Sequence, residues 1–254
     1  MIPAHKFPLG KRLVWRLIDR SFRKYFDRVY FRASDSTNEE QRAALPMIIC
    51  ANHSSWWDGY VIALIDRLLG TDGYLMVEEK QLRRYFFFTW IGCFSVDRQN
   101  TRSALHSLKY AATLLKERGQ SGRTVMVSLF PQGEIFPNDR RPLVFYHGAA
   151  YLARMVNPVQ FYPLAIRIEY LGEQRPALFI SLGEPVLVSA EEVKQPHFLK
   201  SCTQSLEASL TGELDHLRTD ILAGDYSSFK TVIHGKSSTN RIFDALFFRK
   251  QIAR

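Results

Sequence analysis

The chain has 254 residues, of which 46% are hydrophobic and 23% charged, a balance typical of one folded domain and not of a largely disordered chain. Three scattered cysteines (Cys50, Cys93 and Cys202) argue against a disulfide framework or a zinc site and favour a reducing compartment. No apolar run reaches the roughly 18 residues that span a bilayer, no signal-peptide core is seen, and the formal net charge of +9 predicts an anionic partner.

The first predicted element is a basic amphipathic helix over residues 9–32. Its apolar residues recur at helical spacing, and basic residues fill the other face. Residues 1–32 contain nine Lys or Arg against two Asp, so +7 of the net charge lies here. Such a helix binds the surface of an anionic membrane. The alternative interpretation is a helix that covers the core of the domain.

Beyond a polar link, β-branched apolar runs alternate with stretches of helical periodicity. The predicted strands are 46–51, 74–78, 124–130, 159–170 and 177–183. The predicted helices between them are 56–69, 101–119 and 146–156. This alternation predicts an α/β fold in which a largely parallel central sheet is flanked by helices.

Two further stretches combine basic and aromatic residues. Residues 82–92, "LRRYFFFTWIG", are too apolar all round for an ordinary surface helix, and residues 240–254 are a second basic amphipathic segment. We therefore expect residues 1–32 to associate with a membrane. We expect residues 33–254 to form the α/β domain, including its C-terminal helices and basic tail.

A histidine and an aspartate follow the first predicted strand of the sheet. In open α/β sheets, reactive groups gather beyond the carboxyl ends of the strands, and His53 lies two residues beyond residue 51. Asp58 meets His53 only if the chain bends, because five residues of regular helix turn the side chains apart. Ser54 or Ser55 is the expected N-cap that makes this bend, with Trp56 opening the helix. A carboxylate on one imidazole nitrogen would support proton uptake at the other.

Four ordered sequence blocks resemble the glycerolipid acyltransferase family of the lysophosphatidic acid acyltransferase type. They are "NHSSWWD" at 52–58, "GCFSVDR" at 92–98, "LFPQGEI" at 129–135 and "VQFYPLAIR" at 159–167. The resemblance covers roughly residues 46–185. It implies transfer of a fatty acyl group to a lipid hydroxyl.

The resemblance also implies roles for single residues. His53 would be the general base, Asp58 its orienting carboxylate, and Gly133 part of the turn near the developing oxyanion, with Arg98 at the phosphate of the acceptor. The expected substrate-binding residues are Asn52, Arg98, Phe130, Pro131, Gln132, Gly133 and Glu134.

The same resemblance implies the partners of the reaction. The acyl donor would be acyl-CoA or acyl carrier protein, the acceptor lysophosphatidate or a related lysolipid, and neither a metal nor a bound cofactor is expected. We expect peripheral association with the cytoplasmic face of an anionic membrane and no binding of nucleic acid.

The third block departs from the family pattern, and this leaves the acceptor open. Gln132 stands where the family has glutamate, Glu134 where it has threonine, and Ile135 where it has arginine. Either Arg140 and Arg141 replace that arginine, or the acceptor is an unphosphorylated hydroxyl, such as that of a glycolipid or carotenoid glycoside, or a lysolipid other than lysophosphatidate.

Structural roles compete with these functional interpretations. Asp97 and Arg98 could form a structural ion pair, and Trp56 and Trp57 are expected to be packing residues rather than catalytic groups. His147 lies near a position where the family often has lysine. A non-catalytic lipid-binding protein of the same fold is the alternative from another functional class.

Overall fold

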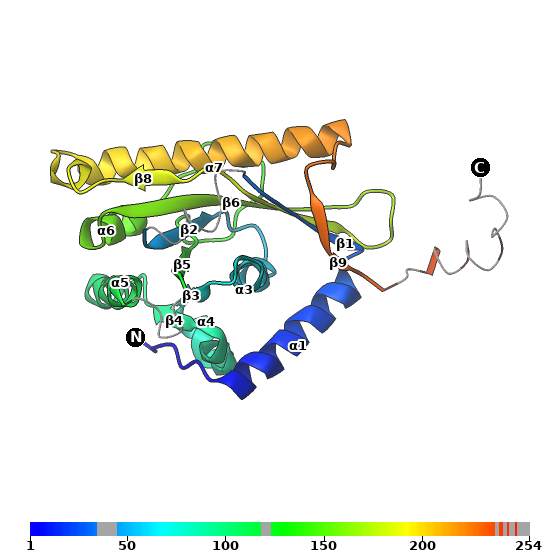
Figure 1. Cartoon of the computed structure of the whole chain (residues 1–254), viewed down its shortest axis with the longest axis horizontal. Coiled ribbons are helices and arrows are strands. Elements are labelled where there is room, and N and C mark those ends of the chain that lie inside the picture. Colours follow the sequence, from blue (N-terminus) through cyan, green and yellow to red (C-terminus); the bar gives the residue numbers. More distant parts are fainter. Residues whose placement is uncertain (35–44, 118–122, 237–238, 241–242, 244–246, 248–254) are drawn as a thin grey trace.

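The computed structural model describes residues 1–34, 45–117, 123–236, 239, 240, 243 and 247 (Figure 1). In chain order the elements are α1 (Pro8–Tyr25), β1 (Arg28–Ala33), β2 (Met47–Ala51), α3 (Asp58–Leu69), β3 (Asp72–Glu78), α4 (Glu79–Arg84), the 3-10 helix η1 (Phe86–Ile91), β4 (Cys93–Val96), α5 (Thr101–Lys116), β5 (Val125–Leu129), α6 (Gly148–Met155), β6 (Val159–Glu169), β7 (Ala177–Leu182), β8 (Val186–Val188), the 3-10 helix η2 (Glu192–Lys194), α7 (Phe198–Ala223) and β9 (Lys230–His234).

The strands of the described chain form one sheet in the order β4-β3-β5-β2-β6-β7-β1-β9, with β8 paired to β6. Strands β4, β3, β5, β2 and β6 are mutually parallel. Strand β7 runs antiparallel to β6, β1 runs parallel to β7, and β9 is antiparallel to β1. The prediction of an α/β fold with a largely parallel central sheet flanked by helices is confirmed.

Two hydrophobic cores lie on opposite faces of this sheet. Alternate residues of β2 point into each core, as the two-residue period of a strand requires. Ile48 and Cys50 join the core built with α5, α6 and α7, whereas Met47, Ile49 and Ala51 join the core built with α1 and α3. Figure 1 shows these two groups of helices on the two sides of the sheet. Because β2 is buried on both faces, the polar residues that follow it lie at the centre of the fold.

The predicted elements of the α/β core are all present. Each of the five strands and three helices agrees with its predicted range to within two residues, except that α5 ends at Lys116, three residues before the predicted end at 119. The strands follow β-branched and aromatic runs, and α3 stops at Gly70, whose φ of 66° suits a glycine C-cap. Local pattern therefore specifies these five strands and three helices.

The predicted helix over 9–32 is correct as far as Tyr25 and wrong beyond it. From Arg28 the chain is strand β1, which pairs with β7 and β9. Val29, Tyr30 and Phe31 prefer strands, and the two partner strands satisfy their backbone groups. Residues 28–32 of the predicted membrane segment thus belong to the central sheet.

Helix α1 has two apolar faces. Its inner face buries Val14, Ile18 and Phe22 in the core, which confirms the interpretation that the helix covers the domain. Its outer face exposes Leu13 and Leu17, at 51% and 49%. Leu9 continues this exposed row, and four exposed arginines lie on the same helix: Arg12, Arg16, Arg20 and Arg23. One helix therefore serves the core and presents a basic, leucine-bearing surface.

The other aromatic and basic stretches have different outcomes. Residues 82–92 form the end of α4 and then η1, which lies against α1. Most of the predicted C-terminal segment 240–254 lies outside the described residues.

Among the helices described, none is long and apolar enough to cross a membrane. The 26-residue α7, which is not among the predicted helices, packs along β6.

Candidate active site

His53 lies just beyond β2, where the carboxyl ends of the parallel strands meet. Its ring stacks on Phe130, which follows the neighbouring strand β5, with 4.4 Å between ring centroids. The backbone N–H of His53 donates to Oε1 of Gln132 at 3.2 Å. The first and third sequence blocks are therefore in direct contact at the carboxyl edge of the sheet, where reactive groups gather in open α/β folds.

His53 and Asp58 form a hydrogen-bonded pair. Nδ1 of His53 lies 2.8 Å from Oδ2 of Asp58. The same carboxylate oxygen accepts the backbone N–H groups of Ser54 and Ser55, at 2.7 and 2.8 Å, and Oδ1 accepts the Ser55 hydroxyl at 2.9 Å. Asp58 is fully buried, so four donors hold its two oxygens in one orientation.

The chain bends between the two residues in a manner that differs in detail from the prediction. Helix α3 begins at Asp58, after Trp57 as N-cap, and not at Trp56. No serine side chain caps the helix end. The Asp58 side chain instead reaches back to the amides before the helix, and the Ser55 hydroxyl accepts the N–H of Trp57 at 3.2 Å. The bend needed to join His53 and Asp58 is therefore made by Asp58 itself.

The bond to Asp58 determines what the imidazole can do. A carboxylate only accepts hydrogen bonds, so the proton on Nδ1 is donated to Asp58 and Nε2 is left as the basic nitrogen. The His53 side chain is 22% exposed while its partner is sealed from solvent. An accessible base on a buried, oriented carboxylate is suited to removing a proton from a hydroxyl.

Asn52, an expected substrate-binding residue, is buried and its side chain bonds to other parts of the protein. It is 3% exposed, and its side chain accepts the N–H of Ile166 at 2.8 Å and donates to the carbonyl of the same residue at 2.9 Å. It also donates to Oδ1 of Asn138. These bonds join the end of β2 to β6 and to the loop after the third block.

Residues 130–133 form a tight turn beside His53. The N–H of Gly133 donates to the carbonyl of Phe130 at 2.9 Å, and the φ of Gly133 is +74°, which favours glycine. The carbonyl of Pro131 accepts the N–H of Tyr146, and the N–H of Phe136 donates to the carbonyl of His53 at 2.8 Å. The Gly133 amide is thus occupied by the turn, and Gln132 faces the His53 backbone.

Arg98 reaches this turn from the end of β4. A Cβ atom on Gly133 would lie 2.8 Å from Nη1 of Arg98 and 2.7 Å from the ring of Tyr146. Arg98 pairs with two carboxylates, Glu78 at 3.4 Å and Glu134 at 3.8 Å. The predicted alternative, an ion pair between Arg98 and its neighbour Asp97, is replaced by these contacts, because Asp97 accepts the N–H of Gln99.

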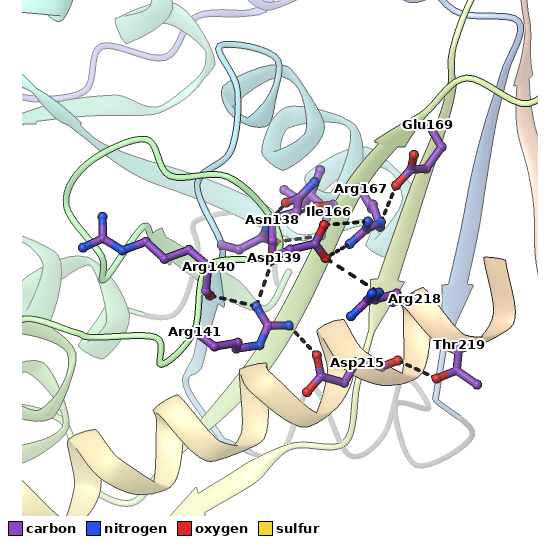
Figure 2. Close-up of polar contacts among 11 residues, drawn as sticks. Asn138, Asp139, Arg140, Arg141, Ile166, Arg167, Glu169, Asp215, Arg218 and Thr219 are labelled. Carbon is purple, nitrogen blue, oxygen red and sulfur yellow. Dashed lines mark hydrogen bonds and ion pairs between the residues drawn. The ribbon is translucent and has the colours of Figure 1, made fainter. Parts of the chain in front are cut away.

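Arg140 and Arg141 belong to a polar cluster between the third block and α7 (Figure 2). Arg141 pairs with Asp215 of α7 and donates to the carbonyl of Asn138. Arg140 points away from that pair and lies over the ring of Phe136, 4.0 Å from its centroid. Arg141 therefore ties the loop to α7.

A second ion pair fixes the same loop to the sheet. Arg167 of β6 pairs with Asp139 at 2.9 Å, and this hydrogen bond lowers the pKa of the Asp139 carboxyl. Arg218 of α7 lies 3.8 Å from the same carboxylate. The loop that supports Asn138 is thereby attached to two elements.

The three cysteines and His147 are buried or hydrogen-bonded elsewhere in the fold. All three cysteines are buried, and burial raises the pKa of Cys93 to about 12 and of Cys202 to about 11. His147 bonds Thr203 of α7 at 2.9 Å. Within the described ranges, no group of three or more His, Cys, Asp or Glu side chains is arranged to hold a metal ion.

The two tryptophans of the first block differ in their surroundings. Trp57 packs among aromatic rings, with centroids 4.9 Å from Phe26 and 5.5 Å from Tyr25. Trp56 is 51% exposed and touches Tyr60. Trp57 is therefore a packing residue, whereas Trp56 presents an aromatic surface next to the site.

Comparison with models of protein families gives a match. A family model described as Acyltransferase matches residues 33–167, more than half of the 254 residues. The matched range contains His53, Asp58, Arg98 and the turn at Gly133. No curated protein matches the chain significantly.

Proposed function

Because the chain belongs to the Acyltransferase family, we propose that this acyltransferase moves a fatty acyl group from a thioester donor to a hydroxyl of a lipid acceptor. The donor is acyl-CoA or acyl carrier protein. The observation that carries the proposal is the bond from His53 to the buried carboxylate of Asp58. It leaves Nε2 of the imidazole as a base at the accessible edge of the sheet.

The proposed reaction has two steps. Nε2 of His53 takes the proton of the acceptor hydroxyl, whose oxygen forms a bond to the thioester carbonyl carbon, and Asp58 stabilises the resulting imidazolium. The tetrahedral intermediate then collapses, the carbon–sulfur bond breaks, and His53 returns the proton to the leaving thiolate. Direct attack agrees with the cysteines, whose buried thiols have raised pKa values.

The acceptor is lysophosphatidate or a related lysolipid if a phosphate binds Arg98. A second candidate is an unphosphorylated acceptor such as a glycolipid or carotenoid glycoside. The pairing of Arg98 with Glu78 and Glu134 favours this second candidate. In both cases the reaction at His53 is the same.

Acyl transfer is tested with the purified full chain. Labelled acyl-CoA and acyl carrier protein are offered with a panel of lysolipids and glycolipids, and products are identified by mass. His53→Ala is expected to lower kcat about 10²- to 10⁴-fold, whereas His106→Ala, which removes an exposed histidine on α5, keeps wild-type activity. Near-wild-type turnover by His53→Ala would rule out the general-base role.

The membrane partner is proposed from the outer face of α1. Leu13 and Leu17 are exposed beside arginines, and Trp56 and Phe86, 51% and 60% exposed, add aromatic surface. Apolar side chains among cations suit the interface of an anionic cytoplasmic leaflet, where the acyl chains of the substrates lie.

Membrane binding is tested by substitution, because deletion of residues 1–32 would also remove β1 and the inner face of α1. The variant Leu13→Glu/Leu17→Glu is expected to reduce sedimentation with anionic liposomes severalfold while the fold is kept. Leu222→Glu, at a leucine 76% exposed on α7, is the control for a glutamate at another exposed leucine. Equal sedimentation of all three proteins would argue against the α1 surface.

A further inference from the structure

The two glutamates at Arg98 come from separate parts of the chain. Glu78 is the last residue of β3, and Glu134 follows Gly133 in the third block. Nη2 of Arg98 lies 3.4 Å from Oε2 of Glu78, and Nη1 lies 3.8 Å from Oε1 of Glu134. The cluster of these three side chains, which we call the Arg98 cluster, has a formal charge of −1.

The Arg98 cluster borders the catalytic residues. The guanidinium lies against the α-carbon of Gly133, where an added Cβ would be 2.8 Å from Nη1. Gly133 is adjacent to Gln132, whose side chain accepts the backbone N–H of His53. A headgroup whose hydroxyl reaches His53 would therefore meet the charges of the Arg98 cluster.

This arrangement is unfavourable for a phosphate. A guanidinium binds a phosphate through paired N–H donors, but both terminal nitrogens of Arg98 already face carboxylates. A phosphate there would also lie beside two like charges, which disfavour it. The guanidinium of Arg141, which the sequence offered as a replacement phosphate ligand, is engaged by Asp215. Hydroxyl groups, in contrast, donate hydrogen bonds to carboxylates without a charge penalty.

We infer that Glu78 and Glu134 determine acceptor specificity by selecting a neutral, hydroxyl-bearing headgroup and excluding a phosphomonoester. This inference rests on the proposed acyl transfer. In it, Arg98 is a positioning residue that holds the two carboxylates against the turn at Gly133. The carboxylates accept hydrogen bonds from the hydroxyls of a glycerol or sugar group.

The test compares two acceptors that differ only in the phosphate. Monoacylglycerol and lysophosphatidate with the same acyl chain are offered at equal concentration in uncharged detergent micelles, and kcat/KM is measured for each. The wild-type chain is expected to prefer monoacylglycerol. Glu78→Gln/Glu134→Gln keeps the side-chain shapes and is expected to shift the ratio toward lysophosphatidate by roughly tenfold.

A variant at a distant glutamate controls for the loss of a negative charge. Glu117→Gln removes one carboxylate at the far end of α5, about 24 Å along the helix from its start by the rise of 1.5 Å per residue. It is expected to leave the acceptor ratio unchanged.

The possible outcomes separate the inference from the proposed function. If the wild-type chain uses lysophosphatidate at least as well as monoacylglycerol, or if the double variant keeps the wild-type ratio, the inference is wrong while acyl transfer stands. If neither thioester donor gives product with any acceptor of the wider panel, the proposed function fails and the inference fails with it.

Discussion

The His53–Asp58 pair and the Arg98 cluster lie at the same edge of the sheet but differ in burial. Asp58 is fully buried and receives four hydrogen bonds, so its position is determined by the surrounding backbone. Side chains of the Arg98 cluster are 32% to 60% exposed, and their ion pairs are longer. The residues proposed for the chemical step are thus held by buried hydrogen bonds. The charges that would meet an acceptor lie on the surface, where substitution costs little stability.

The largest effect within this comparison is expected from Asp58→Asn. The amide keeps the size of the side chain but cannot accept all the donors around it or stabilise an imidazolium. We expect kcat to fall about 10²- to 10⁴-fold, as when a carboxylate is removed from a hydrogen-bonded histidine. Asp225→Asn, in the exposed turn after α7, is the control. A loss below threefold would show that the buried pair is dispensable.

Asn52→Ala is expected to have the next largest effect, mainly on stability. It removes the partners of the buried N–H and carbonyl of Ile166, and we expect a loss of about 2 kcal/mol in the free energy of unfolding. Asn157→Ala, which removes a bond to the carbonyl of Arg154 near a helix end, should cost about 1 kcal/mol or less. Denaturant unfolding measures both. Equal costs would mean that Asn52 does not join β2 to β6.

Sequence predicted most of the α/β core because its signals are local. Strands β2, β3, β5, β6 and β7 are apolar runs, and the helices between them have the period of an amphipathic helix. Strand β1 was mistaken for helix because Phe26 and Val29 continue the helical spacing of α1. Its partner β7 lies about 150 residues further on, and such distant pairing leaves no local trace.

The missed helix α7 is a different case, because its signal was present. Leu206, Leu210, Leu214, Leu217 and Ile221 recur at intervals of three and four residues and are all buried. This is the period of an amphipathic helix. The polar cluster with Asp139 and Arg141 could not be predicted, because it depends on where α7 crosses the loop (Figure 2).

The candidate site, like the fold, was predictable only in part from the sequence. His53 and Asp58 are close in sequence, and the resemblance of four blocks assigned their roles. The approach of Glu78 to Arg98 depends on the parallel register of β3 and β4, which sets Glu78 opposite Val96. That register is visible only in the folded chain. The electrostatic surroundings of Arg98 therefore required the structure.

Gly133→Ala tests the contact between the two regions. Its φ of +74° makes any side chain strained, and the new Cβ would strike Arg98 and Tyr146. Gly172 has nearly the same φ, +75°, but no atom within 4 Å of an added Cβ, so Gly172→Ala has the backbone strain alone, about 1 kcal/mol. We expect both variants to lose stability, but only Gly133→Ala to lose roughly tenfold in kcat/KM, since a displaced turn moves the groups beside His53.

The smallest effect on the neutral acceptor is expected from Arg98→Ala, and the kinetic parameter that changes is the informative result. If Arg98 bound a phosphate, its loss would raise the KM for lysophosphatidate by about tenfold or more, because a charge-assisted bond contributes about 1.5–3 kcal/mol. If Arg98 instead holds Glu78 and Glu134 at the turn, kcat/KM for monoacylglycerol falls severalfold, because the carboxylates that accept its hydroxyls are no longer held, and the KM for lysophosphatidate does not rise. Arg102→Ala, at an exposed arginine of α5, is the control for lost charge. A strong increase in KM with lysophosphatidate alone would return Arg98 to the role of a phosphate ligand, and the difference between the two regions would then lie in burial but not in function.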